Sequence, residues 1–176
     1  MNQTKDLSKL ICLILGAGLL AAGPAQGALN AYMKLTGQRQ GKILGSVTQR
    51  GREGSLEVIA VSHEIVSPRD PATGLPTGKR QHKPFTVMVT LDKALPLLYA
   101  ALVTNETLTD MTLQFYRPNP DGQELNYFTI ELKNASIASI RTVLPDTQDA
   151  STSSHPAQVE ISFTYQKIIW TWIIGK

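Results

Sequence analysis

The chain has 176 residues, a length typical of one domain rather than two. Apolar residues make up 42% and charged residues 18%, so the chain can bury a core, which excludes wholesale disorder and a collagen-like structure. Seventeen Lys and Arg residues against fourteen Asp and Glu residues give a net charge of +3, without the dense basic stripe of a dedicated nucleic-acid binder. Cys12 is the only cysteine, which excludes intrachain disulfides and cysteine-based zinc sites.

Residues 1–27 have the pattern of a signal peptide. Two lysines precede an apolar run from Leu10 to Ala22, which is shorter than the roughly 20 residues that span a bilayer. A Gly-Pro pair ends the run, and small residues then place the expected cut between Gly27 and Ala28. The sequence predicts an exported single domain of residues 28–176; an uncleaved anchor and a start of translation further downstream are the alternatives.

The rest of the chain alternates between apolar and polar residues almost throughout, which predicts β-strands. Over Leu56–Val66 the alternation places Leu56, Val58 and Ala60 on one face and Ile59 and Val61 on the other. The expected strands are 31–35, 43–47, 56–66, 85–91, 111–116, 125–133, 136–144 and 159–165. A glycine-rich turn at 50–54 and an Asn-Pro-Asp-Gly turn at 119–122 separate some of them.

The segment Pro68–Pro84 interrupts this pattern with four prolines and two glycines in 17 residues. Loops beyond about 12–15 residues are uncommon in compact domains, and prolines lower the entropy that a segment loses on docking. The segment is either a solvated loop or, as we favour, an arm that reaches a neighbouring chain. Its cationic side chains would then meet an acidic patch on the partner or keep the segment soluble.

One helix is predicted after this segment. Pro96 suits a first helical turn, because its missing N–H has no partner to lose there. A helical stripe of Leu97, Leu98, Ala101 and Leu102 follows, and Asn105 ends it. About eight strands in succession with one short flanking α-helix predict a mostly β fold, a closed or nearly closed antiparallel β-barrel.

The end of the chain is apolar on both faces from Ile168 to Ile174. An uncovered strand of this kind would be an aggregation-prone edge. Either the chain's own helix or another subunit is expected to cover it. Trp170 and Trp172 are therefore predicted to pack in the core or against another subunit, and burial predicts a loss of about 3–5 kcal/mol when either is replaced by Ala.

Motifs for catalysis are missing from the sequence. It contains no G-x-S-x-G and no H-E-x-x-H, and the spacing of Gly74–Lys79 is too short for a phosphate loop. His63, His82 and His155 are expected in a strand and two loops, and we do not expect them to converge on a metal ion. The sequence predicts no catalytic residue, no cofactor and no metal site, and therefore no enzyme.

Several segments of the chain carry a resemblance to a known family. The longest is His63-Glu64 followed by Ser67-Pro68-x-Asp70-Pro71-x-Thr73-Gly74-x-Pro76-x-Gly78-x-Arg80-x-His82-Lys83-Pro84-Phe85. The matching shorter segments are Asp92–Tyr99, Leu113–Arg117, Phe128-Thr129 and Tyr165–Trp170. Over roughly residues 30–172 the chain resembles the haemolysin-coregulated protein (Hcp) family, the tube proteins of bacterial type VI secretion systems.

The resemblance implies a β-barrel of two packed sheets with one flanking helix. It also implies that six copies form a ring and that rings stack into a secreted tube, within a contractile sheath and below a spike protein. Effector proteins would travel in the lumen as cargo, and no nucleic acid, cofactor or stable membrane span is implied. By analogy the ring-stacking loop consists of Pro68, Arg69, Asp70, Pro71, Thr73, Gly74, Pro76, Gly78, Lys79, Arg80, His82, Lys83 and Pro84.

The N-terminus departs from the family pattern. Members normally begin near the position of Ala28–Tyr32 and leave the cell through the contractile machine. Residues 1–27 therefore define an exported, tube-independent relative (a binding module or secreted virulence factor), a membrane tether, or a start-site artefact upstream of an ordinary tube protein. The first implies transit through the periplasm, and the last implies assembly in the cytoplasm before secretion.

Overall fold

A computed structural model describes residues 30–119 and 121–173 of the chain. The predicted signal segment, its expected cut between Gly27 and Ala28, and Ile174 lie outside the described residues.

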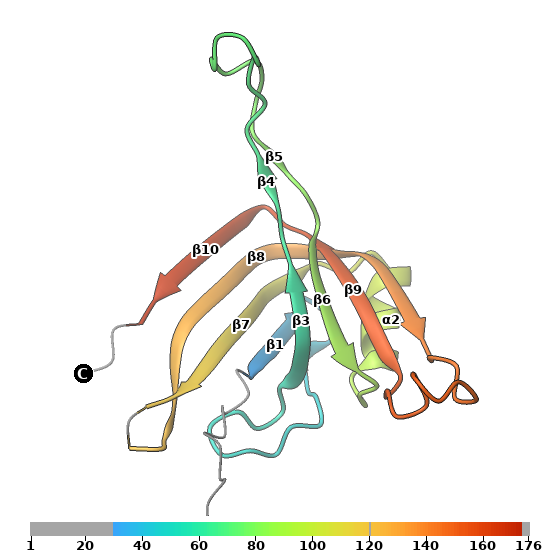
Figure 1. Cartoon of the computed structure of the whole chain (residues 1–176). Coiled ribbons are helices and arrows are strands. Elements are labelled where there is room, and N and C mark those ends of the chain that lie inside the picture. Colours follow the sequence, from blue (N-terminus) through green and yellow to red (C-terminus); the bar gives the residue numbers. More distant parts are fainter. Residues whose placement is uncertain (1–29, 120, 174–176) are drawn as a thin grey trace, which may run out of the picture.

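The core of the fold is a closed antiparallel β-barrel, as the alternation of apolar residues predicts (Figure 1). Its strands pair in the order β8-β7-β1-β3-β6-β9, and β9 returns to β8 to close the barrel. Their bounds are β1 Ala31–Gly37, β3 Leu56–Ser62, β6 Phe85–Thr90, β7 Leu108–Pro118, β8 Glu124–Val143 and β9 Gln158–Thr164. A short strand β2, Gly41–Ile43, pairs with β1, and β10, Lys167–Trp172, pairs with β8.

The closure depends on one long bent strand. Instead of the two predicted strands, 125–133 and 136–144, β8 is a single strand of 20 residues. Asn134 lies within it at φ 48°, a conformation that asparagine tolerates better than most residues. Before the bend β8 pairs with β7 and β10, and after it with β9. The Asn134 side chain donates a hydrogen bond to Gln166 (3.1 Å), which ties the bend to the β9–β10 connection.

The helix α2, Leu95–Val103, packs beside the second half of β8 (Figure 1). Pro96 occupies its first turn as predicted, and the chain leaves the helix at Asn105, where φ is 49°. The buried face consists of Leu95, Leu98 and Ala101. The predicted stripe was wrong at Leu97, which is 43% exposed because the buried face runs from Leu95 rather than from Leu97.

Apolar side chains from all six barrel strands fill the interior. The largest of those that are fully buried include Phe85, Met33, Leu113, Leu132 and Phe163. They occupy alternate positions on their strands, so the side-chain period of two places them inside while their neighbours face outward. On β6 and β9 this alternation holds over the whole strand, which confirms the prediction for these two segments.

The predicted strand 43–47 was wrong beyond Ile43. From Leu44 to Ser55 the chain folds on itself instead, with Gly45 N–H donating to the Gly54 carbonyl (2.8 Å). Arg52 anchors this loop, since its buried guanidinium lies 3.8 Å from the ring centre of Tyr116 and pairs with Glu124 at 2.7 Å. The cation stacked on an aromatic ring adds to the backbone hydrogen bonds that hold the loop.

The predicted strand 56–66 is divided in the structure. β3 ends at Ser62, and its alternation changes phase at Ile59, where the pairing with β6 shifts register. Beyond this irregularity Val61 packs against the core while Ala60 is exposed, which reverses the predicted faces. An extra residue in one strand of a pair has this effect, because side chains alternate with a period of two.

The terminal strand β10 is not covered by the helix. It pairs with the first half of β8, whereas Tyr99 of α2 reaches Thr142 in the second half (2.8 Å). Trp170 is 48% exposed and Trp172 is 59% exposed. The core alternative for these two residues was therefore wrong, because β8 bends between β10 and α2 and separates them (Figure 1).

This exposure changes the expected effect of replacing the tryptophans in a single subunit. Phe163→Ala should lower the free energy of unfolding by about 3–5 kcal/mol, since it empties a fully buried site. Trp172→Ala should lower it by about 1 kcal/mol or less, because its main aromatic contact is an edge-on pair with Tyr127. Urea denaturation at low protein concentration measures both. Equal losses for the two variants would show that Trp172 is buried within the subunit.

Candidate assembly site

The predicted arm is a β-hairpin that projects away from the barrel (Figure 1). At its base β4, Ile65–Val66, pairs with β5, Gln81–His82, and further out Arg69 pairs with Pro76. Lys83 N–H donates to the Glu64 carbonyl (3.0 Å), where the hairpin meets the barrel. All the residues predicted for ring stacking lie in this hairpin, and the structure does not test their role.

Hydrogen bonds to one aspartate fix the conformation of the arm tip. The Asp70 carboxylate accepts hydrogen bonds from Ala72 N–H (2.9 Å) and Thr73 N–H (2.7 Å) and from the Thr73 hydroxyl (2.9 Å). These bonds stabilise the carboxylate and hold the pKa of Asp70 below its usual value. Gly74 then takes φ 71°, which turns the chain back at little cost for glycine. The tip therefore has a defined shape before it meets any partner.

The arm is basic and exposed. Residues 71–84 are all exposed, and Leu75 at the tip is 64% exposed. Between positions 68 and 84 the arm has four cationic side chains and one carboxylate, that of Asp70. The cations are Arg69, Lys79, Arg80 and Lys83. Among the described residues no ion pair involves these cations. They are therefore available to an acidic surface on another molecule.

Two histidines hold the base of the arm to the barrel through one tyrosine. His63 Nε2 lies 2.7 Å from the Tyr165 hydroxyl, and His82 Nδ1 lies 2.8 Å from the same oxygen. His63 follows β3, His82 belongs to β5, and Tyr165 follows β9 at the bend of the β9–β10 connection. Both imidazoles also pack edge-on against the Tyr165 ring, with centroids 5.8 Å apart. We call His63, Tyr165 and His82 the arm clamp.

Burial affects the protonation of the arm clamp. Desolvation, and then the nearby His82, lower the pKa of His63. Desolvation also raises the pKa of Tyr165. A lowered histidine pKa favours the neutral ring, because the buried environment disfavours the imidazolium.

The sequence did not reveal the arm clamp. Predicted as unrelated residues of a strand and a loop, His63 and His82 instead approach the same hydroxyl, whereas His155 lies in the loop between β8 and β9. The sequence could have placed His63 beside His82 if the hairpin had been recognised. Strands that pair Ile65 with His82 also bring His63 close to His82. Tyr165 had no such signal, because its position depends on the bend of β8. In the described ranges no three His, Cys, Asp or Glu side chains gather as metal ligands.

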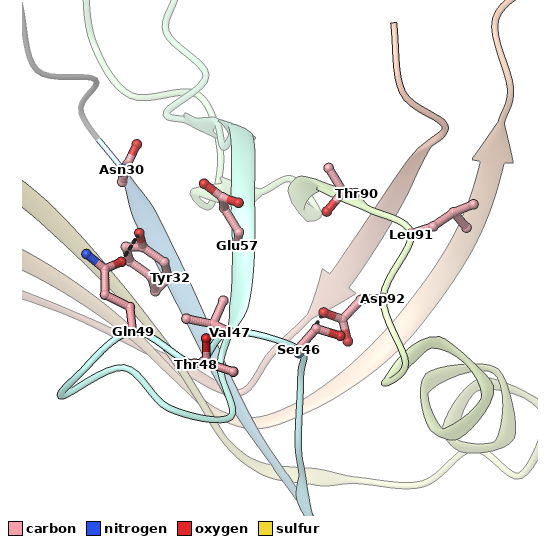
Figure 2. A pocket seen from close by; sticks show the side chains of 10 residues that line it. All are labelled: Asn30, Tyr32, Ser46, Val47, Thr48, Gln49, Glu57, Thr90, Leu91 and Asp92. Carbon is pink, nitrogen blue, oxygen red and sulfur yellow. Dashed lines mark hydrogen bonds between the residues drawn. The ribbon is translucent and has the colours of Figure 1, made fainter.

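A polar pocket lies at the opposite end of the barrel from the arm, and Figure 2 shows the residues that line it. β3 runs from the pocket to the arm, since Glu57 lines the pocket and Ser62 precedes the arm, and β6 returns from Phe85 to Thr90. The lining residues are Asn30, Tyr32, Ser46, Val47, Thr48, Gln49, Glu57, Thr90, Leu91 and Asp92.

The two carboxylates of this pocket differ in their hydrogen bonding. Asp92 accepts hydrogen bonds from Ser46 N–H and Ala94 N–H, both at 2.8 Å, and so fixes the chain before α2. Glu57 is exposed on β3, and its side chain has no hydrogen bond to another described residue. Glu57 is therefore the carboxylate that a cation from outside can reach without disturbing the fold.

A second hollow, of about 590 Å³, lies between the arm base and β10. Its lining residues are Ile65, Arg80, His82, Tyr165, Gln166, Lys167, Ile168 and Trp170. Arg80 and Lys167 make it basic, and the half-exposed Trp170 gives it an apolar wall.

In the described part of the chain no helix is long and apolar enough to cross a membrane.

Comparison with known proteins gives one consistent result. A family model described as "Type VI secretion system effector, Hcp" matches residues 32–172. The chain is 39% identical over 153 residues to the "Major exported protein" of Pseudomonas aeruginosa PAO1, covering 82% of this chain and 89% of that protein. A crystal structure of an Hcp protein is 30% identical with a TM-score of 0.76, and Hcp1 from E. coli EAEC 042 is 34% identical with a TM-score of 0.73. Each of the two matches covers 82% of this chain and 92% of the chain in the solved structure.

Proposed function

The chain belongs to the Hcp family of type VI secretion proteins, and on this premise we propose that it is the structural subunit of the secretion tube. Six copies form a ring, and rings stack head to tail into the tube. The observation that carries the proposal is the arm, a preformed basic hairpin that projects from one end of the barrel while a polar pocket opens at the other.

Contact between subunits within a ring gives the exposed tryptophans a role. β10 pairs with β8 along one edge, and among the described residues its other edge has no strand partner. Trp170 and Trp172 stand half-exposed on this strand. A neighbouring subunit that covers them would bury apolar area at about 25 cal/mol per Å². We therefore assign them to subunit packing rather than to the core.

Stacking of rings gives the arm and the pocket complementary roles. The arm carries four cations, and Glu57 offers a carboxylate at the far end of the same strand pair. When rings stack in one direction, the arm end of each subunit faces the pocket end of a subunit in the next ring. Opposite charges at these two ends favour this orientation over the reverse.

In this proposal the protein acts by assembly and not by catalysis. Its partners are copies of itself, the contractile sheath, the spike protein at the tip, and effector proteins carried in the lumen. Assembly takes place in the cytoplasm, and the protein reaches the cell exterior when the tube is expelled. The name of the Pseudomonas relative, a major exported protein, supports this destination.

The alternative is a tube-independent binding module or secreted virulence factor. It is favoured by residues 1–27, whose two lysines and apolar run match an export signal. A signal that operates would carry residues 28–176 through the periplasm, away from a cytoplasmic sheath. The two functions therefore differ in the route of export and in whether the mature domain forms rings.

Shortening the arm tests the tube proposal. Val66 and Gln81 are paired, so residues 67–80 can be replaced by a two-residue Asn-Gly turn that closes the hairpin and leaves His63 and His82 in place. We expect rings of the variant to form but not to stack, because the contact that reaches the next ring is gone. Electron microscopy shows tubes against single rings, and circular dichroism shows that the barrel is folded. Tubes of normal length from this variant would contradict the proposal.

Exchanging charges tests the pairing of the two ends. Replacing Lys79 and Arg80 by Glu should abolish stacking, and adding Glu57→Lys should restore it in part, since each contact again joins opposite charges. Sedimentation measures the stacked fraction. About 1 M salt, with a Debye length of about 3 Å, should weaken stacks of the unaltered protein as a control. If the triple variant stacks no better than the double, Glu57 does not receive the arm.

The N-terminus separates the two functions. If residues 1–27 operate as a signal, the exported protein should begin at Ala28, and Leu15→Arg should block export, because a charge within the apolar run costs about 2.5–3.5 kcal/mol on insertion. Intact-mass measurement of exported protein from cells with and without the contractile machine decides between the routes. An exported protein that retains residues 1–27 and needs the machine would exclude the signal.

A further inference from the structure

We propose that the arm clamp is an acid-released hinge, which fixes the arm against the barrel near neutral pH and frees its base when the arm clamp is protonated in acid. The proposal concerns a single subunit and does not require the tube. Its evidence is the convergence of two imidazoles, from separate parts of the chain, on the hydroxyl oxygen of Tyr165.

The hydrogen bonds of the arm clamp suit neutral histidines. A phenolic hydroxyl donates one hydrogen bond and can also accept. When both imidazoles are neutral, one ring nitrogen accepts the proton of the Tyr165 hydroxyl, and an N–H of the other ring donates to its oxygen. Both contacts, at 2.7 and 2.8 Å, are then satisfied at once.

Protonation of both rings breaks this arrangement. Each imidazolium nitrogen is a donor only, so neither can accept the Tyr165 hydroxyl proton. Two positive rings would also approach the same oxygen and repel each other in a site where His63 is half-buried. Movement of β5 with His82 away from Tyr165 relieves the repulsion and exposes the half-buried His63 ring to water.

The surrounding charges add to this repulsion. From β10 Lys167 lines the hollow beside Tyr165, and Arg80 lines it from the arm. Lys83 follows His82 toward β6, whose first residue Phe85 packs against the His63 ring. The one carboxylate next to His63 in the sequence, Glu64, is exposed to solvent. Three cations against one solvated carboxylate disfavour further positive charge at the arm clamp.

The direction of the pH effect follows from the protonation of His63. Its pKa is lowered in the closed arm by burial and then by His82. An open arm, with His63 in water at its ordinary value of about 6.5, binds more protons. Stabilisation of the closed arm is therefore complete above that value and is lost as the pH falls below it.

Hydrogen exchange at the arm base measures the hinge in the mature protein. After correction for the intrinsic rate, exchange of the Lys83 amide, which bonds to Glu64, should be several-fold faster at about pH 5 than at about pH 8, because protonation favours the open arm. The Asp70 and Thr77 amides, which bond within the outer arm, should keep their protection. Loss of protection at these outer amides as well would mean that the hairpin unfolds, and would overturn the hinge.

Variants assign the effect to the arm clamp. The double variant His63→Gln with His82→Gln cannot take up protons there and should lose the pH response, while His155→Gln, a matched change in a distant loop, should retain it. Tyr165→Phe lacks the shared hydroxyl and should exchange fast at both pH values. A pH response that persists in the double variant, or a Tyr165→Phe arm as protected as the original, would overturn the proposal, whether or not the protein forms tubes.

Discussion

The fold depends on the bend of β8 at Asn134. A straight strand of 20 residues would extend far beyond a barrel of this size, and β9 would then pair with β6 alone, leaving the barrel open. The positive φ at Asn134 redirects the strand, so that β8 joins β7 and β10 before the bend and β9 after it. The same bend sets the β9–β10 connection, and Tyr165 lies in that connection. One backbone conformation thus closes the barrel and supplies the anchor for the arm.

The candidate functional features of the molecule lie outside the barrel interior. The arm, the pocket with Glu57 and the exposed strand β10 are on three separate parts of the surface, and each offers a different chemistry: positive charge, a carboxylate, and apolar area. This distribution suits the proposed tube subunit, which would contact several copies of itself, with a packed core that keeps the contact surfaces in fixed relative positions.

Local patterns determined what could be predicted from the sequence. Strict alternation identified β6 and β9, and proline content identified the arm, because both signals lie within a few adjacent residues. The register shift at Ile59, the bend at Asn134 and the shared hydroxyl of Tyr165 depend on pairing between distant segments, which a single sequence does not display. Trp170 and Trp172 were recognised as needing a cover, but the alternation could not show that β8 separates them from α2.

The exposed edge of β10 also has a consequence for the kinetics of assembly. A strand with unpaired backbone groups and two half-exposed tryptophans can join any similar edge, so the free subunit is the species at greatest risk of disordered aggregation. In the proposed ring, closure would cover the β10 edge of every subunit, whereas an open chain of subunits would leave that edge exposed in one terminal subunit. In that assembly, rapid ring closure at low concentrations of free subunits would protect the protein, and slow closure at high concentrations would favour aggregation.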